Sequence, residues 1–136
     1  MSAEFSLGIR VYYEDTDAAG IVYHANFLKF MERARTEWLR RLGFEQDQIA
    51  RQHGVGFVVR AAALDFVRPA RFNDALTATA RVVHLGRASI HLRQDVRSEA
   101  GELLCGGDIR VGCVNLRRMA PARMPEDIYL GIRNAS

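Results

Sequence analysis

Apolar and polar residues alternate along several short stretches of the chain, which is the pattern of half-buried β-strands. The first stretch runs from Leu7 to Glu14 and predicts one apolar face, made of Ile9, Val11 and Tyr13. Four more strands are expected, over residues 57–64, 76–82, 89–97 and 109–113. In the strand at 57–64 we expect Phe57, Val59, Ala61 and Ala63 to share one face. Short turn segments join the last three strands, so we expect them to be antiparallel neighbours.

The hydrophobic period changes to that of a helix after His24. The apolar positions then fall on one stripe, formed by Phe27, Phe30, Met31, Ala34, Trp38, Leu39 and Leu42. We expect Asn26 to cap the start of this helix and Gly43 to cap its end. A shorter helix is expected over Gln46–His53, before Gly54.

This order of elements predicts the α+β class. A single long helix must bury its apolar stripe, and an antiparallel sheet curled around the helix is the most economical way to do so. The chain has 136 residues, 49% of them hydrophobic, which is enough for one domain with its own core. Since no linker or internal repeat divides it, we expect residues 1–136 to form a single domain.

Charge and hydropathy narrow the classes of function. The chain has 19 basic and 16 acidic residues, and Lys29 is the only lysine. The basic residues are dispersed, which disfavours a nucleic-acid surface but is compatible with small anionic partners. The longest uncharged stretch, Ala18–Leu28, is far shorter than the roughly 20 residues of a membrane span. The first residues do not resemble a signal peptide.

The two cysteines and a glycine pair belong to the last predicted strand. Cys105 and Cys113 on one strand would lie about 26 Å apart, too far to form a disulfide. We therefore expect free thiols and a cytoplasmic location. Gly106 and Gly107 predict a bulge in this strand.

Residues 13–26 carry most of the candidate chemistry. Asp15, Asp17, Gly20 and His24 lie between the first strand and the start of the long helix. Unpaired N–H groups at a helix start can polarise a carbonyl group, and a nearby carboxylate can act as base or nucleophile. On composition alone, such a loop is more often only a cap and a turn.

This stretch resembles the hotdog-fold acyl-CoA thioesterases, and more narrowly the 4-hydroxybenzoyl-CoA thioesterase family with its Tol–Pal-associated, YbgC-like members. The resemblance rests on Asp15-Thr16-Asp17, Gly20, Val22-Tyr23-His24 and the helical Glu32-Arg33-Ala34-Arg35-Thr36-Glu37. Residues 57–60 and 68–71 fit the same group. The resemblance implies a hotdog fold, in which a five-stranded antiparallel sheet wraps a long central helix. It also implies hydrolysis of an acyl-CoA thioester to a carboxylic acid and free coenzyme A.

The resemblance further implies roles for individual residues. Asp17 corresponds to the catalytic carboxylate, which attacks the thioester carbonyl or deprotonates water, and Asp15 corresponds to a more structural acid. The oxyanion donor would be a backbone N–H at His24 or its neighbour, and the His24 side chain would assist or only orient the loop. We also expect substrate contacts from Tyr13, Gly20 and Tyr23. No cofactor is expected, because coenzyme A is part of the substrate, and no metal is expected, because the helix start already activates the carbonyl.

The expected assembly also follows from the resemblance. It implies homodimers whose sheets join edge to edge, with active sites at the interface, and further association into tetramers. The acyl carrier, either coenzyme A or acyl carrier protein, is left open. So is the preference for acyl chain length or aromatic groups.

Some residues and functions remain as alternatives. Arg87, in a predicted turn, is a candidate for the phosphates of coenzyme A, with a solvated turn residue as the alternative. His53, His84 and His91 lack metal-ligand spacing, and His84 is expected to continue the apolar face of the strand at 76–82. The rival functions are a hotdog hydratase or dehydratase acting on enoyl thioesters, and a non-catalytic module that binds acyl-CoA or an acyl carrier. The acidic motif fits the thioesterases better.

Overall fold

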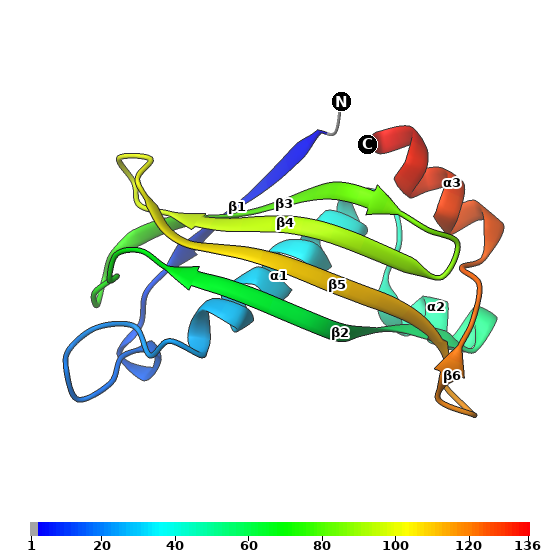
Figure 1. Ribbon diagram of the computed structural model, residues 1–136, viewed down its shortest axis with the longest axis horizontal. Coiled ribbons are helices and arrows are strands. Elements are labelled where there is room, and N and C mark those ends of the chain that lie inside the picture. Colours follow the sequence, from blue (N-terminus) through cyan, green and yellow to red (C-terminus); the bar gives the residue numbers. More distant parts are fainter. Residues whose placement is uncertain (1–2) are drawn as a thin grey trace.

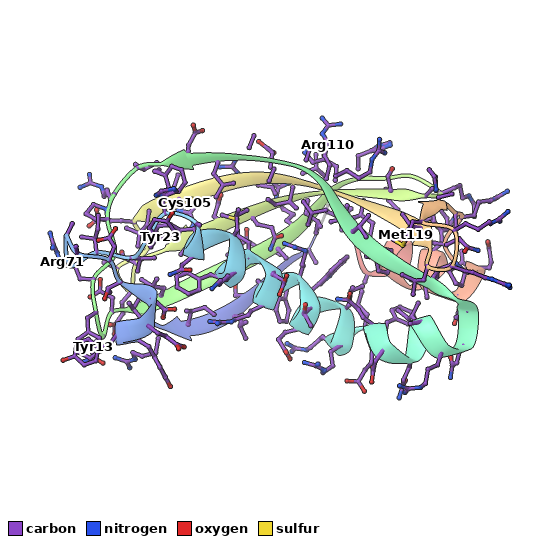
Figure 2. The ribbon with its side chains drawn as sticks, turned by 90° about the horizontal axis from the view of Figure 1, so that it is seen from below. Tyr13, Tyr23, Arg71, Cys105, Arg110 and Met119 are labelled. Atoms are coloured by element: carbon purple, nitrogen blue, oxygen red, sulfur yellow. The ribbon has the colours of Figure 1, made fainter. Side chains whose placement is uncertain are left out.

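The computed structural model describes residues 3–136 and contains one antiparallel sheet with a long helix, α1 (Asn26–Arg41), against one face (Figures 1 and 2). The strands of this sheet are β1 (Glu4–Arg10), β2 (Val55–Phe66), β3 (Ala75–Leu85), β4 (Ser89–Arg97), β5 (Leu103–Asn115) and the two-residue β6 (Ala120–Pro121). Their order is β1-β3-β4-β5-β2, with β6 beside β5. The expected arrangement of a helix and a curled antiparallel sheet is confirmed.

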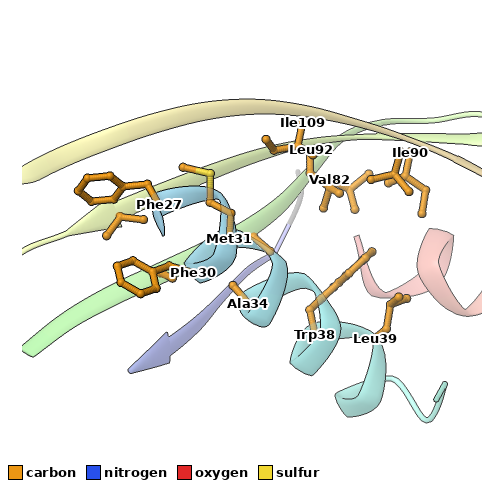
Figure 3. Close-up of a cluster of buried hydrophobic side chains, with 14 of the residues drawn as sticks. Phe27, Phe30, Met31, Ala34, Trp38, Leu39, Val82, Ile90, Leu92 and Ile109 are labelled. Atoms are coloured by element: carbon orange, nitrogen blue, oxygen red, sulfur yellow. The ribbon is translucent and has the colours of Figure 1, made fainter. Parts of the chain in front are cut away.

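The core lies between α1 and the concave face of the sheet (Figure 3). The helical stripe is buried as predicted for Phe27, Phe30, Met31, Ala34, Trp38 and Leu39, whereas Leu42 is half-buried. It faces Val82, Ile90, Leu92 and Ile109 of the sheet. Burying one large apolar side chain contributes about 1.5–3 kcal/mol, so this interface supplies much of the stability of the fold.

Of the two predicted caps of α1, the one at its end is confirmed and the one at its start is wrong. Gly43 ends the helix as predicted, with φ +95°, and its N–H donates to the Arg40 carbonyl while the Phe44 N–H donates to that of Leu39. The prediction for Asn26 is wrong. Ala25 is the N-cap, and Asn26 is the first helical residue, whose amide donates to the Asp15 carbonyl at 2.9 Å. The Asn26 side chain is therefore bonded to Asp15 of the preceding loop and does not cap the helix.

The short helix α2 (Gln46–His53) and its termination at Gly54, which has φ +66°, are confirmed. The first strand is displaced from its predicted range. Strand β1 ends at Arg10, and Tyr13 lies exposed in the short 3-10 helix η1 (Tyr13–Asp15). Alternation therefore continues only through Val11, because the backbone N–H of Tyr12 is bonded to the Asp15 side chain.

A β-bulge in β2 changes the predicted facing of its residues. The register with β5 shifts between Val59 and Ala61, so Arg60 is the extra residue. Ala61 pairs with Arg110, and Ala62 pairs with the buried Ile109. Ala61 and Ala63 therefore do not share a face with Val59, as strict alternation had predicted.

A second bulge lies in β3, where the register with β4 shifts between Val82 and His84. His84 consequently pairs with His91 and is exposed on the convex face of the sheet. The prediction that His84 continues the buried face of β3 is wrong, because the extra residue, Val83, reverses the alternation.

The glycine pair in β5 does not form a bulge. Gly107 pairs regularly with Leu64 on one side and Gln94 on the other. A Cβ atom at Gly107 would lie 2.9 Å from the Met31 sulfur, so glycine here permits α1 to approach the sheet closely. The nearby Cys105 and the more distant Cys113 are both free and buried on β5, as predicted.

The helix α3 (Glu126–Ala135) and β6 were not predicted. Ile128 and Ile132 of α3 are buried, and Gly131 packs against the Phe44 ring, where a Cβ atom would lie 2.6 Å from the ring. Figure 1 shows α3 at the end of the molecule that contains the β3–β4 turn. None of the helices in residues 3–136 is long and apolar enough to cross a membrane.

Candidate active site

A tight turn presents Asp17 between β1 and α1. The Gly20 N–H donates to the Asp17 carbonyl at 2.9 Å, and the Ala19 N–H donates to Asp17 Oδ1 at 2.9 Å. Gly20 has φ +80°, a conformation that glycine adopts without strain. The Asp17 N–H closes the loop by donating to the Ile21 carbonyl. The predicted turn chemistry of this segment is confirmed.

Asp15 is buried and holds the two ends of the loop together. Its Oδ2 accepts the Tyr12 N–H at 2.8 Å, while its backbone carbonyl accepts the Tyr23 N–H and the Asn26 amide, both at 2.9 Å. Sequence reasoning missed Asn26 as the residue that ties the start of α1 to this loop. These contacts are those of a structural acid.

Asp17 differs from Asp15 in both exposure and bonding. Its side chain is exposed, and only Oδ1 is engaged, by the Ala19 N–H. No hydrogen bond within residues 3–136 involves Asp17 Oδ2. One carboxylate oxygen is therefore oriented by the turn while the other is available for chemistry.

The start of α1 offers unpaired backbone donors beside this loop. The first helical bonds run from Phe27 N–H to the His24 carbonyl and from Leu28 N–H to the Ala25 carbonyl. Across the described chain, no hydrogen bond uses the N–H of His24 or Ala25, and no side chain caps the helix. These two N–H groups lie at the positive end of the helix dipole and are free to donate to a bound oxygen atom.

His24 and Tyr23 lie exposed where the loop meets the end of β2. Their ring centroids are 4.4 Å apart, and the His24 and Phe66 rings form a T-shaped pair with centroids 5.9 Å apart. Phe66 also contacts Phe27 of α1, with ring centroids 6.0 Å apart. Phe66 was not singled out from the sequence, because only the fold brings the end of β2 to the start of α1.

Tyr13 lies in a different part of the same end of the molecule. Its ring stacks on Phe72 at 3.8 Å, and both rings line a surface hollow of about 570 Å³ with Tyr12 and Arg10. Figure 2 labels Tyr13 and Tyr23 at the end of the molecule opposite Met119. The loop residues Tyr13, Asp17, Gly20, Tyr23 and His24 are thus grouped at one end of the fold.

Arg87 is not brought to this group within the chain. It lies in the β3–β4 turn, at the far end of β3 from the loop that carries Asp17. The 11-residue β3 is about 35 Å long at about 3.3 Å per residue. Its guanidinium is 3.1 Å from Glu126 Oε2 and stacks 4.0 Å above the Tyr129 ring. Arg87 therefore connects this turn to α3, and its role toward coenzyme A stays a prediction.

A groove leads from the loop along α1. Two hollows, of about 230 and 540 Å³, share the lining residues Glu32, Arg35 and Val59 and lie between α1 and β2. They extend from Leu28 to Leu39, which is about 16 Å at 1.5 Å per helical residue. The smaller hollow, nearer the start of α1, is lined mainly by apolar side chains, including Leu28, Val59, Ala62 and Ile109.

A buried polar network lies beneath this groove. Gln94 of β4 is fully buried, and its amide nitrogen donates to the Met31 carbonyl at 2.8 Å and the Thr79 carbonyl at 3.1 Å. Its Oε1 accepts a hydrogen bond from Arg35 at 3.2 Å. Burial lowers the pKa of the Arg35 guanidinium, and the nearby Glu32 carboxylate opposes this effect. Gln94 thereby anchors α1 to the sheet.

The described residues contain no group of three or more His, Cys, Asp or Glu side chains that could hold a metal ion.

The thiols of Cys105 and Cys113 are expected not to react with thiol reagents in the native protein. Burial, reinforced by Asp65 and Asp95, raises the pKa of Cys105 to about 11, and burial also raises the pKa of Cys113. An aromatic disulfide reagent at pH 8 should therefore detect almost no thiol until denaturant is added, and then two per chain. Rapid reaction of the native protein would contradict this expectation.

The raised thiol pKa also has a consequence for stability. Because the folded-state pKa of Cys105 lies above the ordinary value of 9.0, its contribution to stability is complete below about pH 9. That contribution is lost as the pH rises toward 11.

Comparison with known proteins shows that this chain is similar to thioesterases. The model of the thioesterase-like superfamily matches residues 11–132. The chain is 40% identical over 124 residues to the acyl-CoA thioesterase YbgC of Haemophilus influenzae, covering 91% of this chain and 90% of that protein.

Two solved structures share the fold. A probable thioesterase from Bartonella henselae has a TM-score of 0.84 and 34% identity, covering 90% of this chain and 100% of that one. The Staphylococcus aureus protein SAV2348, solved in complex with CoA, has a TM-score of 0.90 at 14% identity, which shows the fold alone. The latter match covers 99% of this chain and 85% of that one. The expected hotdog fold is confirmed.

Proposed function

The chain belongs to the thioesterase-like superfamily, and from this premise we propose that it hydrolyses acyl-CoA thioesters with Asp17 as the reacting carboxylate. The products are a carboxylic acid and free coenzyme A. The observation that carries the proposal is that one short loop contains both a carboxylate with an unbonded oxygen, Asp17 Oδ2, and the unpaired N–H groups of His24 and Ala25 at the start of α1.

These groups have complementary tasks. The thioester carbonyl accepts hydrogen bonds from the free N–H groups, and the positive end of α1 stabilises the negative charge that develops on the oxygen. Asp17 acts on the carbonyl carbon in one of two ways. It removes a proton from water, whose oxygen then bonds to that carbon, or Oδ2 itself forms the bond and gives a mixed anhydride that water later cleaves.

In both routes the carbon–sulfur bond breaks and the sulfur leaves as a thiolate, which takes up a proton to become the free thiol of coenzyme A. A single turnover in ¹⁸O-labelled water tests for the anhydride. Label in the Asp17 side chain would establish an anhydride that water cleaves at the aspartyl carbon, whereas label in the product acid alone fits both the water route and cleavage of the anhydride at the acyl carbon.

The groove between α1 and β2 is the space that we assign to the acyl group. It begins beside the helix start and contains apolar side chains over about 16 Å. Glu32 and Arg35 line both of its hollows, so a polar acyl group can find a partner partway along it.

A panel of acyl-CoA substrates of different chain length, together with benzoyl-CoA, tests the proposed reaction. Release of free thiol is measured for each, and the native protein's own buried thiols should not interfere. We expect hydrolysis of at least one class. Hydration of an enoyl-CoA without thiol release would instead indicate a hydratase, and tight binding without turnover would indicate a binding module.

We also propose that two copies pair through the open edge of β2. This strand has 12 residues and is paired only with β5 in the described sheet. Phe66 at its end and Val67 directly after it are 55% and 53% exposed, and Val59 is 49% exposed farther back in the strand. A long apolar edge of this kind favours pairing with another chain.

Light scattering should therefore give a mass of at least about twice 15.3 kDa for the native protein. Ala63→Glu places a charge at this edge and should give a monomer with much lower activity, whereas Ala100→Glu, in the exposed β4–β5 turn, should keep the native mass. A monomeric but fully active native protein would contradict the proposed pairing. Association beyond the dimer is read from the same measurement.

Cellular placement is a separate proposal. The two free cysteines on one strand suit a reducing compartment, so we propose that the protein acts in the cytoplasm. A functional link to the Tol–Pal system, and use of acyl carrier protein in place of coenzyme A, follow only from the group resemblance. Activity on acylated carrier protein tests the second of these directly.

A further inference from the structure

The convex face of the sheet, on the side away from α1, carries an unusual row of basic residues. His84 of β3 pairs with His91 of β4, and His91 pairs in turn with Arg110 of β5. Paired residues on adjacent strands lie on the same face with Cβ atoms about 4.5–5.5 Å apart. Figure 2 shows Arg110 projecting from the face of the sheet opposite α1. Three strands thus place three basic side chains in one line.

The β2 bulge adds a fourth basic residue to this row. Arg60 is the extra residue of the bulge, and its side-chain stem crosses directly over Gly112, where a Cβ atom would lie 2.6 Å from Arg60 Cδ. The second bulge, at Val83, is what turns His84 to this face. Both departures from regular pairing therefore bring basic side chains to the same place.

These side chains line a cavity of about 440 Å³, which is within the usual size range of small-molecule sites. Its lining comprises Arg60, Ala61, His84, Ser89, Ile90, His91, Arg110 and Val111, with no carboxylate among them. Two of them, Arg60 and Arg110, are arginines on adjacent strands, and like charges that face one another across a sheet are destabilising.

The acidic residues of β4 and β5 on this face are paired with arginines, and Asp65 of β2, on the same face, is exposed and forms no ion pair with any described residue. Asp95 is paired with Arg93 and Arg97, and Asp108 is paired with Arg93 at 3.3 Å. Asp108 also approaches His91 Nε2, at 3.4 Å, but this buried nitrogen has no hydrogen bond. Within residues 3–136, Arg60 and Arg110 form no ion pair.

We propose that this cavity is a phosphate-binding site, in which Arg60 and Arg110 bind a phosphomonoester. His91 and Ser89 lie beside the bound group. Arginine suits this task because its planar guanidinium can donate two parallel hydrogen bonds to phosphate oxygens. The ligand is either the nucleotide end of coenzyme A or a separate small phosphorylated molecule. The site does not depend on Asp17, so binding can be measured without turnover.

The test uses isothermal titration calorimetry with adenosine 3′,5′-bisphosphate and with inorganic phosphate. The native protein should bind the bisphosphate, and the double variant Arg60→Gln with Arg110→Gln should bind it at least tenfold more weakly. The matched control is Arg51→Gln with Arg133→Gln, which removes two charges from exposed positions on α2 and α3 and should change the affinity less than about twofold. Circular dichroism checks that all variants are folded.

Steady-state kinetics then separates the two sources of phosphate. A raised KM for acyl-CoA with unchanged kcat in the double variant would assign the site to the nucleotide end of the substrate. An unchanged KM with lost bisphosphate binding would assign it to a separate phosphorylated ligand. Absence of binding by the native protein, or an equal loss of affinity in the control variant, would overturn the proposal.

Discussion

Asp17→Asn is expected to lower the turnover of acyl-CoA by about 100-fold or more, the effect typical of a lost general base. The substitution removes the charge and the proton-accepting ability of the free oxygen. It retains the side-chain oxygen that accepts the Ala19 N–H, so the turn that presents residue 17 should stay intact. Thiol release under saturating substrate measures the effect, and the melting temperature should be nearly unchanged.

The control for this result is Asp127→Asn, the same chemical change at an exposed carboxylate on α3, which should leave turnover within about twofold of the native value. Near-normal hydrolysis by Asp17→Asn would remove this carboxylate from the mechanism. Asp15→Asn offers a useful contrast. Because Asp15 is buried and bonded to the Tyr12 N–H, its replacement should act mainly through stability of the loop.

Gln94→Leu is expected to lower the free energy of unfolding by about 2–4 kcal/mol. It leaves the buried Thr79 carbonyl and the Arg35 guanidinium without their shared partner, and each buried polar group left unsatisfied costs about 1–3 kcal/mol. The bond from Gln94 to Met31, which holds the first half of α1 against β4, is lost as well. Urea denaturation followed by circular dichroism measures the change.

The exposed Gln48 of α2 provides the matched control, since Gln48→Leu should change stability by less than about 0.5 kcal/mol. A loss for Gln94→Leu as small as that of the control would show that the network contributes little. The expected loss would identify the network as the anchor that fixes how deeply α1 sits on the sheet. The depth matters for function because the start of α1 carries the unpaired donors of His24 and Ala25.

The two β-bulges explain why the predicted facing of residues in β2 and β3 was partly wrong, and they also bring basic side chains to the cavity on the convex face of the sheet. Alternation along 57–64 and 76–84 predicts faces correctly only up to the bulged residue. Beyond it, one added residue reverses every side chain, and a bulge depends on how neighbouring strands pair rather than on local composition. For this reason the sequence did not predict the row of basic residues that includes His84 and Arg110.

The glycines of β5 and the helix α3 were misjudged for a related cause. Gly106 and Gly107 look like a break in a strand, yet they make room for Arg93 and Met31 from other elements. In α3, the buried positions Ile128 and Ile132 form only a short apolar pattern. What stabilises that helix is its packing against distant partners, including the Phe44 ring near Gly131.

The sequence by itself determined the elements whose signals are local. The stripe of α1, its end at Gly43, the short helix α2 and the Asp17–Gly20 turn all depend on residues within a few positions of one another, so periodicity and turn chemistry suffice to predict them. The grouping of Asp17 and His24 was also predictable, because only seven positions separate them.

Only the tertiary structure decided the features that depend on distant contacts. It separated the buried Asp15 from the exposed Asp17, brought Phe66 to His24, and placed Arg87 with Glu126 at the far end of the sheet. It also gathered Arg60, Arg110 and two histidines around one cavity. The physical reason is that burial and strand register are set by the elements that pack together, whose partners lie tens of residues away in the chain.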